Sequence, residues 1–226
     1  MTRDPVAAAV RLPARQNLAD DVHEALKAMI MDHVIEPGAR VNVYALSREL
    51  GVSQTPLREA LAHLEADGLV VKESLRGFFV APLISRAQFE DLFEFRLLIE
   101  PWSAARAAER CGPEGHRSLR AELATCTDVP EGGEYADYKA VATHDHRFHV
   151  LVAELSGNDN MPPAFERTNC HLHIFRLFYQ TYVGTAAIDE HGAVTDAITA
   201  GDPEAAEAAM RRHIESSRAR LRAAFD

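Results

Sequence analysis

The chain has 226 residues, 47% of them hydrophobic and 26% charged, and carries a formal net charge of -10. That length suffices for one or two domains. No run of eighteen apolar residues occurs, so we expect neither a membrane span nor a signal peptide, and hence a cytoplasmic protein. The three cysteines form no CxxC motif, and their odd number argues against a disulfide framework.

The negative charge is unevenly distributed along the chain. Residues 1–80 contain 9 Lys or Arg and 11 Asp or Glu, a net charge of -2, whereas the remainder carries a net charge of -8. Affinity for nucleic acid depends on the local field at the contact surface and not on the total charge. A near-neutral N-terminal region can therefore still present cations to DNA.

A first helix is predicted after a flexible arm over residues 1–17, with Asn17 as its N-cap. A strand-like run over residues 39–43 leads to a second helix, which Gly51 ends with the left-handed conformation that a sharp turn needs. The apolar positions that recur at helical spacing in the first helix are Leu18, Val22, Ala25, Leu26, Met29 and Ile30.

A third helix follows the turn, with Ser53 or Thr55 as its cap and Pro56 in its first turn. Its apolar side is formed by Leu57, Leu61 and Leu64. The opposite side is short and polar, which suits insertion into a major groove. There the arginine could bond a guanine edge or a phosphate, and the glutamine an adenine edge. This outward side consists of Gln54, Thr55, Arg58 and Ala62.

A two-stranded hairpin is predicted next, from the apolar runs 69–71 and 78–80, with Arg76 beside Gly77 at its tip. Three helices and such a wing, in this order, are typical of a winged helix-turn-helix that binds DNA. The alternative is a small core without a ligand, in which Arg58 and Glu59 form only a solvated surface pair.

Residues 18–80 resemble the winged-helix domain of the GntR family of bacterial transcriptional regulators. The matching segments are 35–38, 51–53, 55–61, 64–65, 67–69 and 76–78. The resemblance implies that Ser53 and Thr55 contact phosphates and that Arg58 is the main arginine of the recognition helix. It also implies that Arg76 and Gly77 form the wing near the minor groove. Gln54 and Tyr44 depart from the family pattern, so no operator sequence can be transferred.

The sequence after residue 81 is almost continuously helical. It begins with a capping box from Ser85 to Gln88 and carries no strand signal, which predicts an antiparallel helical bundle. The fold expected is thus mainly α, with a winged helix-turn-helix over residues 18–81 and an all-α domain over residues 85–226. Further helices are expected at residues 114–126, 134–156, 161–182, 186–200 and 203–224.

A metal site is suggested by Asp145 and His149, which lie one helical turn apart and so project from the same face. His191, near the start of a later predicted helix, and His213, in the last one, could join them in the core of a bundle. Three imidazoles and one carboxylate suit zinc, nickel, cobalt, iron or manganese better than calcium or magnesium. The alternative is a surface hydrogen-bonded pair and histidines with ordinary partners.

Residues 85–226 resemble the ligand-binding bundle of the FadR subfamily of GntR regulators, of the FCD type. The matching segments are 96–100, 145–149, 157–158, 190–191, 201–202 and 210–214. The resemblance implies a divalent metal, zinc first, on Asp145, His149, His191 and His213, completed by a small organic acid. Arg96 is the candidate clamp for its carboxylate, against a surface-type pair with Glu100. His144 and His146 are expected on other faces of the helix.

The sequence thus predicts a homodimeric transcriptional regulator, a repressor in preference to an activator, and not an enzyme. It would bind a near-palindromic operator in double-stranded DNA with an affinity that a small carboxylate metabolite controls. Two other readings remain open. One is a metal-dependent, hydrolase-like enzyme, and the other is a sensor whose signal is the metal itself.

Overall fold

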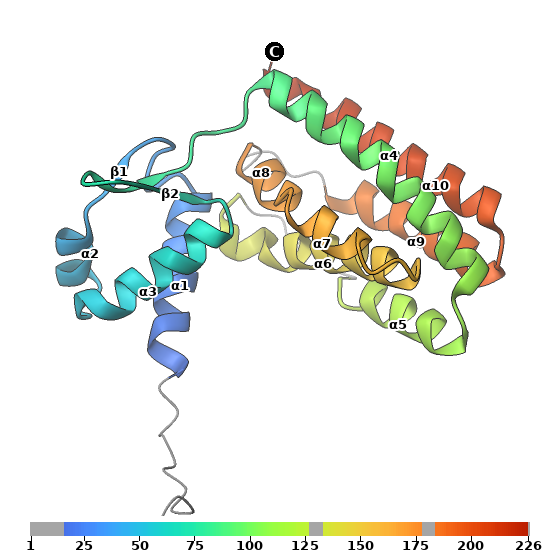
Figure 1. Ribbon diagram of the computed structural model, residues 1–226, viewed down its shortest axis with the longest axis horizontal. Coiled ribbons are helices and arrows are strands. Elements are labelled where there is room, and N and C mark those ends of the chain that lie inside the picture. The colour runs from blue at the N-terminus through green and yellow to red at the C-terminus, as the bar shows by residue number, and fades with distance from the viewer. Residues whose placement is uncertain (1–15, 127–132, 178–183, 226) are drawn as a thin grey trace, which may run out of the picture. The chain divides into compact units, whose positions relative to one another are not determined.

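The computed structural model describes residues 16–126, 133–177 and 184–225, which form two compact units (Figure 1). Among these residues, the first unit runs to Ile30 and continues from Gly38 to Ala81, and the second contains Met31–Pro37 and everything from Pro82 onward. The segment Met31–Pro37 lies within the range expected for the DNA-binding domain. The expected arm falls almost wholly outside the described residues.

The first unit combines three helices with a small sheet. Its helices are α1 (Gln16–Met31), α2 (Val43–Glu49) and α3 (Gln54–Ala66), and its strands are β1 (Arg40–Val41), β2 (Val70–Glu73) and β3 (Gly77–Val80). The antiparallel sheet has the order β1-β3-β2. The expected hairpin is therefore extended by a third strand, because Arg40 and Val41 pair with Phe79 and Phe78.

Of the six apolar positions predicted in the first helix, Val22, Leu26 and Ile30 are buried, two are half-buried and one is exposed. Leu26 and the three apolar residues of α3 are fully buried, whereas Leu18 is 52% exposed. Leu18 lies in the first turn of α1, which begins at Gln16 and not after the predicted cap at Asn17. Apolar side chains at the ends of helices often extend beyond the core that they flank.

Local backbone chemistry sets the turn between α2 and α3. The Asn42 side chain accepts a hydrogen bond from the Ala45 amide and so caps α2. Gly51 adopts a φ of +66°, a left-handed conformation that a side chain would disfavour. Ser53 occupies the N-cap position of α3, but its side chain makes no capping hydrogen bond within the described residues. Its hydroxyl is therefore left for other partners.

The second unit is an all-α bundle, so the predicted fold class is confirmed. Its long helices are α4 (Arg86–Arg110), α6 (Tyr135–Leu155), α9 (Gly184–Ala200) and α10 (Pro203–Leu221). Shorter elements are α5 (Pro113–Leu123), α7 (Met161–Glu166), α8 (Cys170–Leu177) and the 3-10 turn Arg222–Phe225. The capping box at Ser85 is present, with both of its hydrogen bonds.

The predicted helix over residues 161–182 is in fact two helices. The chain turns between α7 and α8 at Asn169, whose φ is +47°, and the Thr168 hydroxyl accepts a hydrogen bond from the Cys170 amide. Asparagine tolerates the left-handed conformation better than other residues with a side chain, which accounts for the break without glycine or proline. Residues 178–182 of that prediction lie outside the described part of the chain.

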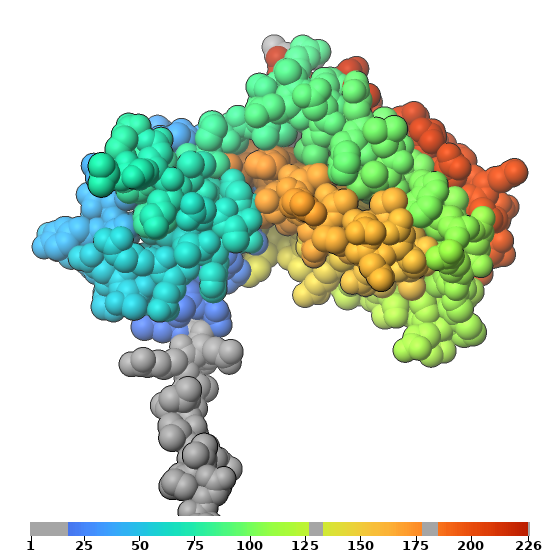
Figure 2. Space-filling model, viewed as in Figure 1, coloured from blue at the N-terminus to red at the C-terminus, as the bar shows by residue number. Residues whose placement is uncertain are grey.

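The bundle packs α4 against α10, α6 and α9, and on the face drawn in Figure 2 the atoms of α7 meet those of α4. Glu90 of α4 accepts hydrogen bonds from Arg218 of α10 and from Arg222, which ties these segments together. None of the helices in the described ranges is long and apolar enough to cross a membrane. Prominent buried core side chains are Phe89, Phe93, Phe148, Phe165, Val194, Ile198 and Met210.

Candidate metal centre and nucleic-acid interface

Three helices of the second unit bring the four predicted metal ligands together. Asp145 and His149 lie one turn apart on α6, His191 lies on α9 and His213 on α10. The three imidazoles are almost completely buried, and Asp145 is half-buried. His191 lies in the middle of α9 and not near its start, as the sequence suggested, because α9 begins no later than Gly184.

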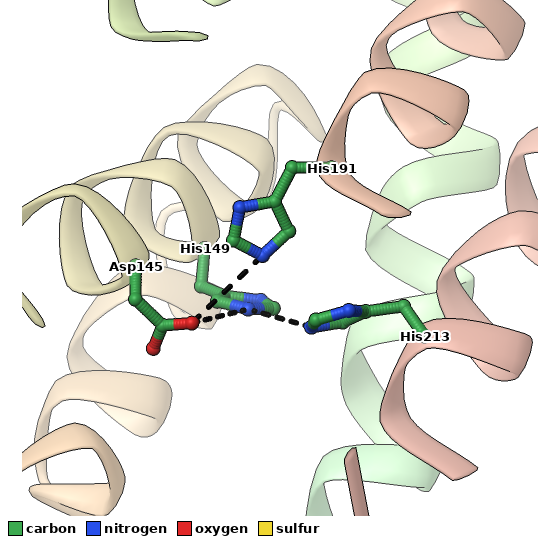
Figure 3. Close-up of side chains that lie close together, drawn as sticks. All are labelled: Asp145, His149, His191 and His213. Atoms are coloured by element: carbon green, nitrogen blue, oxygen red, sulfur yellow. Dashed lines mark hydrogen bonds and ion pairs between the residues drawn. The ribbon is translucent and has the colours of Figure 1, made fainter. Parts of the chain in front are cut away.

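The four side chains point toward one another (Figure 3), and one potential ligand atom from each lies within 4.8 Å of all the others. Asp145 Oδ1 lies 3.9 Å from His149 Nε2 and 3.8 Å from His191 Nε2. His213 Nε2 lies 3.3 Å from His149 Nε2. Each imidazole therefore presents the same nitrogen, Nε2, to a common centre.

This arrangement fits a transition-metal ion. Metal–nitrogen bonds of about 2.1 Å in a tetrahedral site place neighbouring ligand atoms about 3.4 Å apart, close to the observed separations. The Nε2 atom of His191 is buried and has no hydrogen-bond partner among the described residues, which is what we expect of a nitrogen that binds a metal ion. The donor set is one that zinc and its neighbours favour.

The outward nitrogens of two ligands face carboxylates. His149 Nδ1 lies 2.5 Å from Glu100 Oε2, and His213 Nδ1 donates to Glu190 Oε2 at 2.8 Å. Each carboxylate also accepts from an arginine, Arg96 for Glu100 and Arg220 for Glu190. Such second contacts hold an imidazole in one tautomer and one orientation, which is how metal ligands are usually supported.

Electrostatics favour the neutral forms of His191 and His213 and the ionised form of Glu100. Burial and the neighbouring histidines lower the pKa of His191 well below its ordinary value. Burial also lowers the pKa of His213, although Glu190 opposes this change. Burial by itself would raise the pKa of Glu100, but the charges of Arg96 and His149 and their hydrogen bonds lower it to about 2. The imidazoles of His191 and His213 therefore favour the neutral form, which is the form that binds metal.

Arg96 lies between Glu100 and the candidate metal site. Its Nε donates to Glu100 Oε1 at 2.6 Å, one turn away on α4, so the pair exists. The pair is buried, however, and not of the surface type, since Arg96 is only 2% exposed. Its Nη2 lies 3.3 Å from His149 Nε2, the nitrogen that faces the centre. The guanidinium therefore reaches from Glu100 to the edge of the site.

His144 is the residue that sequence reasoning missed. Its side chain is 2% exposed, and its Nε2 lies 3.1 Å from Nδ1 of His191. His144 lies on a different face of α6 from Asp145, and that face is buried as well, against α5 and α9. Residues 141, 144, 148 and 152 form a buried stripe with helical spacing, and that stripe was the available signal.

The predicted DNA-reading residues of α3 lie on an exposed face. Ser53, Gln54, Thr55 and Arg58 are all exposed, opposite the buried leucines. At the wing, Arg76 is exposed, pairs with Glu73, and stacks over the Phe79 ring at 5.0 Å. Gly77 has a φ of +100°. The turn between β2 and β3 thus places Arg76 beside a glycine whose backbone conformation other residues adopt only with difficulty.

A winged helix-turn-helix joined to an all-helical domain defines a two-domain, DNA-binding regulator. Family models match both parts, "Bacterial regulatory proteins, gntR family" over residues 18–80 and "FCD domain" over residues 91–216. The chain belongs to the GntR family of bacterial regulators, in the group with an FCD domain. It is a transcriptional regulator and not an enzyme.

Curated relatives extend over both domains. The chain is 30% identical to an HTH-type transcriptional regulator in an unstable DNA locus of Streptomyces ambofaciens, over 91% of this chain and 83% of that protein. It is 27% identical to the HTH-type transcriptional regulator LutR of Bacillus subtilis, over 82% of this chain and 93% of that protein.

Solved structures share the fold. Escherichia coli McbR/YncC superposes with a TM-score of 0.68 at 20% identity, covering 92% of this chain and 99% of that one. Streptococcus agalactiae GntR gives a TM-score of 0.50 at 25% identity, with 89% and 99% covered. The whole described architecture, and not only the DNA-binding part, is therefore common to this group.

Proposed function

We propose that this regulator is an operator-binding repressor whose affinity for DNA is controlled by a small carboxylate, held at a divalent metal in the second unit. The observation that carries the proposal is the convergence of four ligand atoms within 4.8 Å, with Nη2 of Arg96 beside them. An ion there would supply open coordination positions, and the arginine would supply a hydrogen-bond donor for an anion.

The charge balance supports an anionic effector. Glu100 is paired with Arg96 and Glu190 with Arg220, so these four groups cancel. Asp145 alone then faces the ion with a negative charge. A divalent cation would leave one positive charge in excess in a buried place, where an uncompensated charge is costly. One carboxylate would neutralise that excess, whereas a neutral ligand or a cation would not.

The metal assignment rests on the donor atoms. Imidazole nitrogens suit zinc, nickel, cobalt, iron and manganese, whereas calcium and magnesium prefer oxygen ligands. Zinc is our first assignment, because a site with one carboxylate and three imidazoles can be tetrahedral or expand when an effector enters. Asp145, His149, His191 and His213 would hold the ion.

DNA recognition is assigned to α3 and the wing. Arg58 would contact a base edge or a phosphate from the exposed face, Ser53 and Thr55 would contact phosphates, and Arg76 would approach the minor groove. Gln54 would read a base, with adenine as its usual partner. We propose a homodimer on a near-palindromic operator, since two identical readers match two half-sites related by a two-fold axis.

The test begins by selecting an operator from random duplex DNA with the purified protein, and continues with fluorescence anisotropy. We expect a near-palindromic sequence, and an affinity that small carboxylates change only when the protein carries metal. An affinity that follows metal concentration and ignores every carboxylate would replace the proposal with a pure metal sensor. An affinity that responds to neither would overturn the regulatory role of the site.

A further inference from the structure

We propose that His144 is a positioning residue, which fixes the tautomer and orientation of His191 so that Nε2 of His191 faces the metal. This inference rests on the proposed metal site, but it concerns residues outside the four ligands. His144 lies on α6, next to Asp145, yet its imidazole turns toward α5 and α9. It therefore contacts a ligand without contacting the centre.

The hydrogen-bond chain has only one consistent direction for neutral rings. His144 Nδ1 lies 3.1 Å from the Glu122 carbonyl oxygen and 3.2 Å from Glu122 Oε1. A backbone carbonyl oxygen can only accept a hydrogen bond, so Nδ1 of His144 carries the proton and donates. The Nε2 atom of neutral His144 then has a lone pair and accepts.

The lone pair on Nε2 of His144 determines which ring nitrogen of His191 carries the proton. His144 Nε2 lies 3.1 Å from His191 Nδ1, which must therefore be the donor. Neutral His191 then has an unprotonated Nε2, directed to Asp145 Oδ1 at 3.8 Å and ready for an ion.

A second contact, in addition to the hydrogen bond with His144, orients the ring of His191. The ring of Phe148 stacks on it, with centroids 4.0 Å apart and an interplanar angle of 17°. Phe148 lies one turn after His144 on α6, so both supports of His191 come from the same face of one helix. Stacking fixes the plane, and the hydrogen bond fixes the rotation within that plane.

His144 also differs chemically from the supports of the other two imidazoles. His149 and His213 face the carboxylates of Glu100 and Glu190, each paired with an arginine. His191 instead faces a neutral acceptor, which orients the ring without adding a negative charge beside it. Outer contacts of this kind typically change metal affinity 10- to 100-fold, roughly, when removed.

The first experiment uses the unaltered, metal-free protein. Long-range proton–nitrogen NMR of histidine labelled with nitrogen-15, in mildly alkaline buffer, distinguishes the two neutral tautomers of each ring. We expect the proton of His191 on Nδ1 and the proton of His144 on Nδ1. A proton on Nε2 of His191 would overturn the proposal.

The second experiment measures metal affinity, by competition with a chromophoric chelator, in a pair of matched variants. His144→Gln keeps an acceptor at about the reach of Nε2, whereas His144→Met keeps the length but offers only a weak thioether acceptor. We expect zinc affinity to fall about 10- to 100-fold in H144M and to stay near that of the wild type in H144Q. His116→Met, on α5 and away from the centre, serves as the control.

The outcomes separate this inference from the proposed function. If the wild type retains metal and H144M binds it equally well, His144 has no positioning role although the metal site stands. If both variants lose affinity equally, the acceptor is not the cause and the inference also fails. If the wild type itself holds no metal, the proposed function fails first, and the inference with it.

Discussion

His213 and Glu190 are joined by a hydrogen bond of 2.8 Å between Nδ1 and Oε2. Glu190 precedes His191 on α9, yet the two neighbours serve different parts of the centre. His191 offers its own nitrogen, whereas Glu190 crosses to α10 and orients the ligand there. Arg220, also on α10, donates to both oxygens of Glu190. Glu190 therefore connects α9 to α10 and also orients the imidazole of His213.

Replacing His213 with alanine should lower the bound metal, since three ligands remain and the cavity loses an imidazole. Inductively coupled plasma mass spectrometry of purified protein measures the effect directly. His116→Ala removes a histidine of α5 outside the cluster and should leave the metal content unchanged. If H213A retains all of its metal, then α10 contributes no ligand to the proposed site.

Metal removal should lower the thermal stability of the second unit. An ion that binds only the folded protein stabilises it by about 2.7 kcal/mol when the free ion is 100 times the dissociation constant. Because the ligands come from α6, α9 and α10, we expect a chelator to lower Tm, and added zinc to restore it. An unchanged Tm in a protein shown to release its metal would contradict this expectation.

Arg58→Ala should weaken operator binding by about 1–3 kcal/mol while the protein keeps its fold, because the side chain is exposed and buries nothing. Fluorescence anisotropy with the selected operator gives the affinity, and circular dichroism checks the fold. Arg117→Ala, an exposed arginine of α5, is the charge-matched control. Equal affinity in R58A and R117A would exclude Arg58 from the reading face.

Much of this architecture could be predicted from the sequence, because local patterns decide it. The spacing of Leu57, Leu61 and Leu64 indicated the inner face of α3, and the spacing of Asp145 and His149 placed two of the proposed ligands on one side of α6. His191 and His213 are different, since no local pattern places α9 and α10 beside α6. Their assignment depended on resemblance to a family.

The errors have a common physical origin, which is that tertiary packing overrides local signals. His144 and Asp145 lie about 100° apart on a helix, so only a helix buried on two sides can use both. The break at Asn169 has no glycine or proline to indicate it, and no local pattern shows that β1 pairs with β3. These features depend on contacts with other helices and strands, whose positions cannot be predicted from local sequence patterns.

Removing the charge of Arg96 should destabilise the second unit strongly. In Arg96→Leu the buried carboxylate of Glu100 loses its main partner, which typically costs about 3–5 kcal/mol. The double variant R96L/E100L removes both charges and should cost less than R96L alone. Urea denaturation monitored by circular dichroism measures the free energy of unfolding. A double variant less stable than R96L would show that the pair is not the source of the effect.

The contact between Glu90 and the arginines of the C-terminal helix should depend on pH. Hydrogen bonds from Arg222 and Arg218, against a smaller effect of burial, lower the pKa of Glu90 from its ordinary 4.5 to about 2. A carboxyl whose pKa falls on folding stabilises the protein above its unfolded pKa, and this stabilisation is lost as the pH falls from 4.5 toward 2. Glu90→Gln should therefore lower Tm at pH 7.

The same variant supplies its own control. The difference in Tm between wild type and E90Q should shrink as the pH falls toward 2 and below, because protonation removes the charge of Glu90. Because the partners are partly exposed, the effect at neutral pH should stay at or below about 1 kcal/mol. A difference in Tm that is constant with pH would assign the effect to packing and not to charge.

The distribution of the proposed ligands over three helices has a consequence for the order in which the metal site would form during folding. Asp145 and His149 emerge during synthesis well before His191, and His213 emerges later still. A nascent chain can therefore bind an ion only weakly until α10 has formed and packed. Once bound, the ion would act as a cross-link between distant segments, similar to a disulfide but removable by a chelator. Uptake of metal would then report that the bundle is fully assembled.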